Sequence, residues 1–318
     1  MAAMVAIYDA SLYNLIMEVA GALGGAMRGA AERAGAQSPP PHPLLLLRRG
    51  LAESPGWFLV QAAEFEPQPL TLADLRVRDI YASERIVRAL LDLMASERFL
   101  ESGVPGAYHL TETGRAALRQ SRQRQHALLA TLEPALGDEG SRLVELLGQL
   151  IRASLESGPP PGPWCLTHSR RRAPEPRATP LAHLAQYCDD MNAFRDDAHM
   201  AAWQPLGISG HAWEAFALCC QGDAASADGV YEILAYRGYV RDEYAVALDQ
   251  AAQHGWLEAG SAADTYAVTA AGRALRADVE RRTDHYFFGP WSGLTEQEIA
   301  TTPDLLRRVR DLLNATAR

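Results

Sequence analysis

Two stretches of this chain repeat the same order of residues, and this repeat constrains the fold more than any other feature. An aromatic-Leu-Glu step is followed by a short polar segment, then by Tyr and Thr, and then by Gly-Arg-Ala. The offset is 157 residues before the polar segment (99 to 256) and 158 after it (108 to 266), so one inserted residue explains the change. The repeat predicts two copies of one folding unit. The matching segments are Phe99–Glu101, Tyr108–Thr111 and Gly114–Arg119 in the first copy, and Trp256–Glu258, Tyr266–Thr269 and Gly272–Arg276 in the second.

Each copy has the pattern of two helices joined by a tight turn and followed by a hairpin. Apolar residues at helical spacing mark the second helix, and a Thr at an N-cap position marks the helix after the hairpin. In the first copy, Thr71 and Asp74 form a capping-box pattern before the first helix. This order predicts two winged helix-turn-helix units in tandem, a mainly α fold with small β-hairpin wings. The predicted first helix, turn and second helix lie at 72–78, 79–82 and 83–97, and then at 226–236, 237–238 and 240–254.

A proline-rich segment separates the two halves of the chain. Residues 157–180 are dense in proline, which disfavours both helix and sheet, so we expect a linker without either. The predicted domains are residues 1–156 and 181–318, each with one winged-helix unit and its flanking helices. We expect the flanking helices to cover the cores or to form a homodimer interface. They are predicted at 5–34, 115–153, 180–203 and 295–316.

The composition describes a globular protein and excludes several classes. The net charge of −9 over 318 residues argues against a general polyanion binder, although a local basic face suffices for sequence-specific DNA binding. The four cysteines include no CxxC pair, which argues against a disulfide scaffold and against a structural zinc site. No stretch has the roughly 18 apolar residues of a membrane span. We therefore expect a cytoplasmic protein without a membrane partner.

The motif after the first hairpin resembles that of the MarR family of transcription factors. It reads Leu110-Thr111-Glu112-Thr113-Gly114-Arg115-Ala116-Ala117-Leu118, and helices before and after the unit also match that family. The resemblance implies a winged-helix fold and DNA binding. One departure is that MarR wings usually carry an Asp and an Arg near the tip, whereas neither wing of this chain has an Arg. No glycine-rich segment follows that would support a methyltransferase reading.

Residues of about 180–310 resemble an actinobacterial SalK-like group of MarR-type proteins. This resemblance strongly implies the winged-helix fold. It implies DNA binding only because the group is customarily classed with DNA-binding regulators. The residues that carry it are Phe194–His199, Gly207, Glu214, Gly255–Leu257, Thr269–Arg276, Glu280, Thr283, Asp284, Pro290 and Trp291.

Candidate DNA contacts cluster around the turn and the second helix of the first copy, because phosphates and base edges are bound by cations and hydrogen-bond donors. The alternative is a solvated helix face. The second copy offers only Arg237 and Arg241 there, and Asp242 and Glu243 would repel phosphates. The predicted DNA-binding residues are Arg76, Arg78, Tyr81, Ser83, Arg85 and Arg88.

A polar helix at 183–199 is a candidate small-molecule site. His183, Asp190 and Asp197 recur every seven residues and so share a helix face. The alternatives are an exposed helix with ordinary i,i+4 pairs and a divalent metal site, and we predict no metal. If the protein were an enzyme, His199, Arg195 and Asp197 would be its catalytic residues. The predicted ligand-binding residues are His183, Asp190, Arg195, Asp197, His199, Trp203, Glu280 and Asp284.

Three functions are compatible with these features. The first is a MarR-type transcriptional regulator that binds duplex DNA and responds to a small-molecule ligand. The alternative is a small-molecule-binding protein or enzyme that reuses a tandem winged-helix scaffold without binding DNA, because a fold does not determine a function. A third is a structural or partner-binding protein that dimerises through its N-terminal and post-wing helices. No cofactor is indicated, and enzymatic activity is the less favoured reading.

Overall fold

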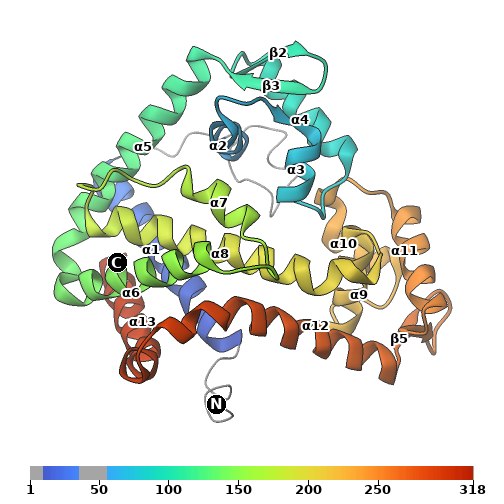
Figure 1. Cartoon of the computed structure of the whole chain (residues 1–318). Coiled ribbons are helices and arrows are strands. Elements are labelled where there is room, and N and C mark those ends of the chain that lie inside the picture. Colours follow the sequence, from blue (N-terminus) through green and yellow to red (C-terminus); the bar gives the residue numbers. More distant parts are fainter. Residues whose placement is uncertain (1–9, 36–55, 318) are drawn as a thin grey trace. The chain divides into compact units, whose positions relative to one another are not determined.

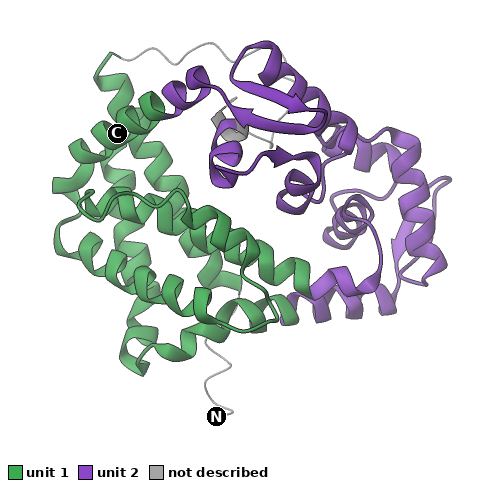
Figure 2. Cartoon of the chain, turned by 45° about the horizontal axis from the view of Figure 1, so that its top comes forward, with its two compact units in different colours: residues 1–39, 119–201, 282–318 green, residues 40–118, 202–281 purple. Residues whose placement is uncertain are grey.

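The structure is a computed structural model that describes residues 10–35 and 56–317. Those residues are mainly helical, with one three-stranded and one two-stranded antiparallel sheet, as the repeat predicts (Figure 1). The chain forms two compact units, each assembled from separated stretches (Figure 2). Unit 1 comprises residues 1–39, 119–201 and 282–318, and unit 2 comprises 40–118 and 202–281. Both winged-helix copies lie in unit 2, whereas the predicted linker 157–180 lies in unit 1.

Unit 1 is a helical body around one apolar core. Its helices α1 (Ala10–Arg33) and α13 (Glu296–Thr316) run in the same direction. Arg33 donates to the Thr316 carbonyl at the C-terminal ends of both helices, and Glu18 pairs with Arg310 at earlier positions of both. The apolar face of α1 is thereby buried within its own chain. The other helices are α6 (Gly137–Glu156), α7 (Trp164–Arg170), most of α8 (Pro180–Trp203), and the ends of α5 (Glu112–Leu132) and α12 (Ala270–Phe288). The predicted flanking helices are thus present, with 115–153 divided between α5 and α6.

The proline-rich segment contains a helix, so the expectation that it excludes regular structure is wrong. Its prolines flank a stretch from residue 164 to 173 that has none, which leaves room for the two turns of α7. Asp197 of α8 accepts hydrogen bonds from the backbone N–H groups of Cys165 and Leu166 at 2.8 and 3.0 Å. A carboxylate at this position satisfies two otherwise orphaned donors of the first helical turn.

The first winged-helix copy forms as predicted. After α2 (Gly56–Phe65), the chain enters β1 (Leu70–Thr71), α3 (Leu72–Arg78) and α4 (Glu84–Ser96), and then the hairpin of β2 (Leu100–Val104) and β3 (Ala107–Leu110). The capping box between Thr71 and Asp74 is present at the start of α3, and Ser83 caps α4 by accepting from the Ile86 N–H. Helices α3 and α4 therefore begin where their N-cap residues predict.

The second copy repeats this order after the short 3-10 turn at Gln204–Leu206. Its elements are α9 (Gly210–Gln221), α10 (Ala227–Leu234), α11 (Arg241–Gln253), β4 (Leu257–Ala259), β5 (Tyr266–Val268) and the start of α12. Three further short 3-10 turns lie at Glu133–Ala135, Ala235–Arg237 and Gly289–Gly293. The Tyr266 N–H donates to the Ala225 carbonyl at 2.7 Å, which takes the place of the β1–β3 pairing of the first copy.

The repeated Thr-x-x-Gly motif has a structural explanation. In both copies the Thr hydroxyl donates to the carbonyl of the aromatic residue before the hairpin, at 3.2 Å for Thr111 and 3.1 Å for Thr269. The Gly three positions later donates its N–H back to that hydroxyl at 3.0 Å. A side chain on Gly114 or Gly272 would collide with the same carbonyl oxygen, so the helix closes on the hairpin only with glycine there.

Candidate functional site

The turns of the two helix-turn-helix motifs pack against each other within unit 2. The Ser83 N–H, at the start of α4, donates to the Arg237 carbonyl at 2.8 Å. Arg85 donates from Nη2 to the Gly238 carbonyl at 2.7 Å and to the Glu243 carboxylate at 2.9 Å. Gly238 has a φ of +79° and lies against Ser83 and Ile86, where a Cβ would find no space. The second copy therefore contacts the start of α4 at Ser83, Arg85 and Ile86, although the Arg85 side chain stays largely exposed.

Arg237 is the central side chain of this junction. Its guanidinium binds Glu214 of α9 through Nε and Nη2, at 3.0 and 2.6 Å, and Asp79 of the first copy through Nη1 at 3.1 Å. The rings of Tyr81 and Tyr236 lie 5.3 and 4.8 Å from the guanidinium carbon, within cation–π range. Burial raises the pKa of Glu214, and the charge of Arg237 opposes that rise. One buried arginine thus joins the two copies.

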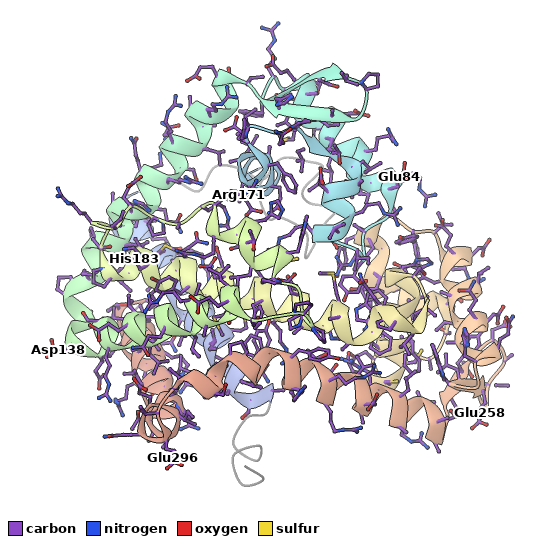
Figure 3. All side chains as sticks on the ribbon, viewed as in Figure 1. Glu84, Asp138, Arg171, His183, Glu258 and Glu296 are labelled. Carbon is purple, nitrogen blue, oxygen red and sulfur yellow. The ribbon has the colours of Figure 1, made fainter. Side chains whose placement is uncertain are left out.

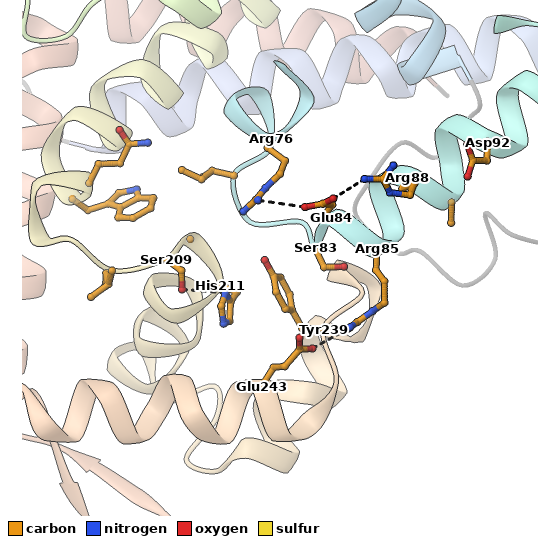
Figure 4. Close-up of a pocket in the computed structure, with 16 residues that line it drawn as sticks. Arg76, Ser83, Glu84, Arg85, Arg88, Asp92, Ser209, His211, Tyr239 and Glu243 are labelled. Atoms are coloured by element: carbon orange, nitrogen blue, oxygen red, sulfur yellow. Dashed lines mark hydrogen bonds and ion pairs between the residues drawn. The ribbon is translucent and has the colours of Figure 1, made fainter. Parts of the chain in front are cut away.

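A pocket of about 850 Å³ opens beside this junction, with all of its lining residues in unit 2 (Figure 4). Helices α3 and α4 supply one side, and the segment from Trp203 to His211 and the start of α11 supply the other. This volume is in the range of small-molecule sites. Its lining residues are Arg76, Ile80, Ser83, Glu84, Arg85, Arg88, Ala89, Asp92, Trp203, Gln204, Ile208, Ser209, Gly210, His211, Tyr239 and Glu243.

Charged groups from α3 and α4 converge on one carboxylate in the pocket. Glu84 accepts from Arg88 at 2.7 Å and lies 4.0 Å from Arg76, so two arginines from different helices flank it (Figure 4). Both arginine side chains are exposed to solvent. Two guanidinium groups around a single carboxylate form a site that a different anion can occupy.

Aromatic rings form the opposite wall of the pocket. The rings of His211 and Tyr239 are stacked with centroids 4.1 Å apart, and His211 Nδ1 lies 3.1 Å from the Ser209 hydroxyl. Burial lowers the pKa of His211, with a smaller contribution from Arg76 that Glu243 opposes. Burial therefore favours the neutral form of this imidazole, which offers a flat surface to a ligand.

The structure divides the predicted DNA-binding residues into two sets. Arg76 and Arg88 are exposed at the pocket, where Arg88 is held by Glu84. Arg85, Ser83 and Tyr81 contact the second copy or residues beside it: Tyr81 packs on Trp203 with ring centroids 6.2 Å apart. Their role in DNA binding stays a prediction.

Arg78, the sixth predicted DNA contact, lies half-buried in the last turn of α3. The wing between β2 and β3 exposes Glu101, Ser102 and Val104 and no cation. Any phosphate contact by the first copy therefore depends on α3 and α4 rather than on its wing.

The second recognition helix has a different surface. Counted from the N-cap residues Ser83 and Val240, an offset of 157, the positions of Arg85 and Arg88 are occupied in α11 by Asp242 and Ala245. Arg241 is paired with Asp228 and Asp242, at 2.9 and 3.3 Å. The helix also exposes Val240 and Val246. This acidic and apolar face is poorly suited to phosphates.

Most of the predicted ligand-binding residues of α8 bind other parts of unit 1. Asp190 is fully buried and accepts from Ser169, Arg170 and Gln186 at 2.7, 2.7 and 2.8 Å. Together with Asp197, which caps α7, it fastens the short helix to α8. Burial raises the pKa of both carboxyl groups, for Asp197 to about 6. Asp190 and Asp197 therefore do share a face of α8, as predicted, but this face binds the α7 segment of the same chain.

The remaining predicted ligand residues are spread over both units. Arg195 pairs with Asp284 of α12 at 2.7 Å and lies over the Tyr13 and Phe287 rings, while His199 Nδ1 is 3.2 Å from the Thr283 hydroxyl. The others are dispersed. His183 of α8 (Figure 3) has its ring centroid 6.0 Å from that of Tyr187, in a tilted arrangement. Glu280 pairs with Arg276, and Trp203 stacks on Trp213.

Of these eight residues, only Trp203 lines the pocket of unit 2. The pocket residues that were not predicted as site residues are Ile80, Glu84, Ala89, Asp92, Gln204, Ile208, Ser209, Gly210, His211, Tyr239 and Glu243. A His beside a Ser before an apolar helix is too common a pattern to mark a site, so the sequence contained no usable signal.

The described residues contain neither a cluster of metal ligands nor a helix that could span a membrane. In residues 10–35 and 56–317, no three His, Cys, Asp or Glu side chains come together in a way that could hold a metal ion. None of the helices in these ranges has both the length and the hydropathy of a membrane span. A second cavity, of about 510 Å³, lies in unit 1 between the end of α6 and the 289–293 turn, and Glu156, His285 and Tyr286 are among its lining residues.

Comparison with known families gives one match. Residues 122–317, more than half of the chain, match the model of a helix-turn-helix family. The matched region includes the helix pair α10–α11 and the hairpin of the second copy, and it begins after the first copy. No curated protein and no solved structure gave a significant match. The match and the two motifs described above agree, and the chain belongs to this helix-turn-helix family.

Proposed function

We propose that this protein is a DNA-binding transcriptional regulator of MarR type, and that a small molecule in the unit 2 pocket controls its affinity for DNA. The observation that carries the proposal is that three arginines of the first helix-turn-helix motif line the pocket: Arg76, Arg85 and Arg88. These are the side chains that this motif would present to phosphates and base edges. A ligand that occupies the pocket therefore competes with DNA for the same groups.

The pocket chemistry favours an anionic ligand with a flat ring. Its acid group would take the place of Glu84 between Arg76 and Arg88, and its ring would lie against the stacked His211 and Tyr239. The exchange replaces the Arg88–Glu84 hydrogen bond and the longer Arg76–Glu84 ion pair with contacts to the ligand, and it releases the Glu84 carboxylate. A released carboxylate beside the recognition helix repels DNA, which gives the ligand a way to lower DNA affinity.

The DNA-binding half of the proposal concerns the first copy. The positions of Arg85 and Arg88 of α4 are occupied in α11 by Asp242 and Ala245, and the one arginine of α11, Arg241, is paired with two carboxylates. We therefore expect one working recognition helix per chain and not two helices spaced by one turn of DNA.

Band-shift titration with the DNA upstream of the protein's own gene tests this function. At low salt, where electrostatic binding is strongest, the wild type should shift this DNA, and Arg88→Gln should bind it at least several-fold more weakly. Arg281→Gln is the matched control, because Arg281 is also exposed and paired with a carboxylate of its own helix. No shift by the wild type at low salt would refute the DNA-binding proposal.

The alternative, a small-molecule-binding protein that has lost DNA binding, is favoured by one observation. The start of α4, which in helix-turn-helix proteins contacts base edges, is hydrogen-bonded to the Arg237 and Gly238 carbonyls of the second copy. Ligand binding can be followed separately through the fluorescence of Trp203 in the pocket, with Trp203→Phe to assign the signal among the six tryptophans. Saturable quenching together with no DNA shift would favour this alternative.

A further inference from the structure

The second cavity lies wholly within unit 1, which is green in Figure 2. The last turn of α6 and the residues after it, from Ala153 to Pro161, form one side. The end of α12 and the turn at Gly289–Gly293 form the other side, and the two segments pack against each other. The volume of about 510 Å³ is in the range of small-molecule sites. None of the side chains used in the proposed function lies here, so this cavity needs an explanation of its own.

Two polar side chains from different helices face this cavity without partners. Glu156 of α6 and His285 of α12 both line it, and neither forms a hydrogen bond or an ion pair with any residue that the structure describes. Arg152, one turn before Glu156, does not line the cavity, and no other arginine is among the described lining residues. Exposed carboxylates elsewhere, such as Asp278 and Asp304, are paired with arginines of their own helices. The Glu156 carboxylate is therefore available to a ligand.

The backbone adds negative potential beside this carboxylate. The C-terminal end of a helix carries about half an elementary negative charge, because its last carbonyls have no partners within the helix. Helix α6 ends at Glu156, and its C-terminal turn lines the cavity. The helix end and the carboxylate therefore both favour a positively charged ligand.

The rest of the lining offers acceptors rather than donors. The hydroxyls of Ser157 and Ser292 already donate to the carbonyls of Ser154 and Gly289, at 2.7 and 2.9 Å. Proline has no N–H group to donate. Three prolines line the cavity: Pro160, Pro161 and Pro290. An anion would find few donors here, whereas a ligand that brings its own N–H groups would find acceptors.

We propose that the unit 1 cavity binds an organic cation, with an alkylammonium group held by the Glu156 carboxylate. The ammonium donates a charge-assisted hydrogen bond to Glu156, and a neutral His285 imidazole accepts a second one. Tyr286 and the prolines give the apolar part of the ligand a surface, and a tyrosine ring attracts cations. A bare divalent ion is the poorer fit, because Glu156 is the one carboxylate among the described lining residues.

Isothermal titration calorimetry of the full-length protein with phenethylamine tests this inference. The assay is run at pH 8, where alkylamines are still cations and ordinary imidazoles are neutral. Phenethyl alcohol is the matched ligand control, because it has the same skeleton without the charge. Glu156→Gln removes the carboxylate and keeps the side-chain shape. Glu145→Gln is the matched protein control, because Glu145 is also exposed in α6 but lies about 16 Å away along the helix axis and does not line the cavity.

The wild type should bind the amine saturably at one site per chain, and the alcohol much more weakly. Glu156→Gln should weaken amine binding by at least about tenfold, the loss expected for a charge-assisted hydrogen bond, and Glu145→Gln should not. Arg88→Gln, in the unit 2 pocket, should leave amine binding unchanged.

Three outcomes would overturn the inference. They are no saturable binding of the amine by the wild type, equal binding of the amine and the alcohol, and an amine affinity that Glu156→Gln leaves unchanged or that Glu145→Gln lowers equally. The measurement does not involve DNA, so its failure would leave the proposed function standing, and failure of the DNA titration would leave this site standing.

Discussion

Replacing Arg237 with methionine should destabilise unit 2 strongly at neutral pH. The side chains of Arg237, Asp79 and Glu214 are only 14%, 8% and 19% exposed, so the substitution leaves two buried carboxylates without their shared cation. Removing one partner of a buried ion pair costs about 3–5 kcal/mol, and methionine retains much of the packing volume. We expect a loss in that range in the free energy of unfolding at pH 7.5.

The loss should shrink as the pH falls. Burial already raises the pKa of Glu214, and the positive charge of Arg237 opposes that rise. Without Arg237, the pKa of Glu214 in the folded protein rises further above its value in the unfolded chain. The folded state then favours protonated Glu214, so lowering the pH stabilises the variant and raising the pH destabilises it. Each unit of pKa difference corresponds to about 1.36 kcal/mol. The variant should therefore regain part of its stability between neutral pH and about pH 5.

Urea unfolding at pH 7.5 and 5.0, followed by circular dichroism, measures both effects. Arg241→Met serves as the control, because Arg241 pairs with Asp228 and Asp242 at the surface, where ion pairs contribute little to stability. A loss below about 1 kcal/mol for Arg237→Met, or an equal loss at the two pH values, would refute the reasoning. The double variant with Glu214→Gln should recover stability if the orphaned carboxylate is the cause.

Three further outcomes are expected. Gly114→Ala should lower the unfolding midpoint clearly, because its Cβ would collide with the Phe99 carbonyl, whereas Gly103→Ala, with open space around it, should not; thermal denaturation compares them. Burial lowers the pKa of His211, so unit 2 should lose stability as the pH falls below about 6.5, and His211→Gln should reduce that loss in a pH series of urea midpoints. Asp197→Ala should release α7 and so speed modification of the buried Cys165 by a thiol reagent; an unchanged labelling rate would contradict the capping role.

Much of the fold could be predicted from the sequence because local signals set its helix boundaries. The capping pattern of Thr71 and Asp74 and the periodic apolar residues of α4 depend only on neighbours along the chain. Helices α2 and α9 were not predicted. The sequence of α9 (Gly210–Gln221) is apolar on most of its surface, so it lacks the contrast between faces that reveals an amphipathic helix.

The candidate site was less predictable because it depends on contacts between distant residues. The pocket exists because the two helix-turn-helix turns pack together, and its wall joins Arg76 to Tyr239 across more than 150 positions. The seven-residue spacing of Asp190 and Asp197 predicted that they share a helix face. The segment that this face binds, α7, lies in the part of the chain that was predicted to be a linker. A periodic pattern shows which residues share a face and does not show what that face contacts.

The junction between the two copies also bears on how this protein can change. In a symmetric homodimer every substitution occurs in both subunits, and each interface residue must suit its own copy. Here Arg237 faces Asp79, while their counterparts at an offset of 157 are Ile80 and Tyr236, so the bridge exists once. Covalent fusion frees each half to mutate alone. One winged-helix copy can then specialise in contacts with nucleic acid, while the other evolves as its packing partner.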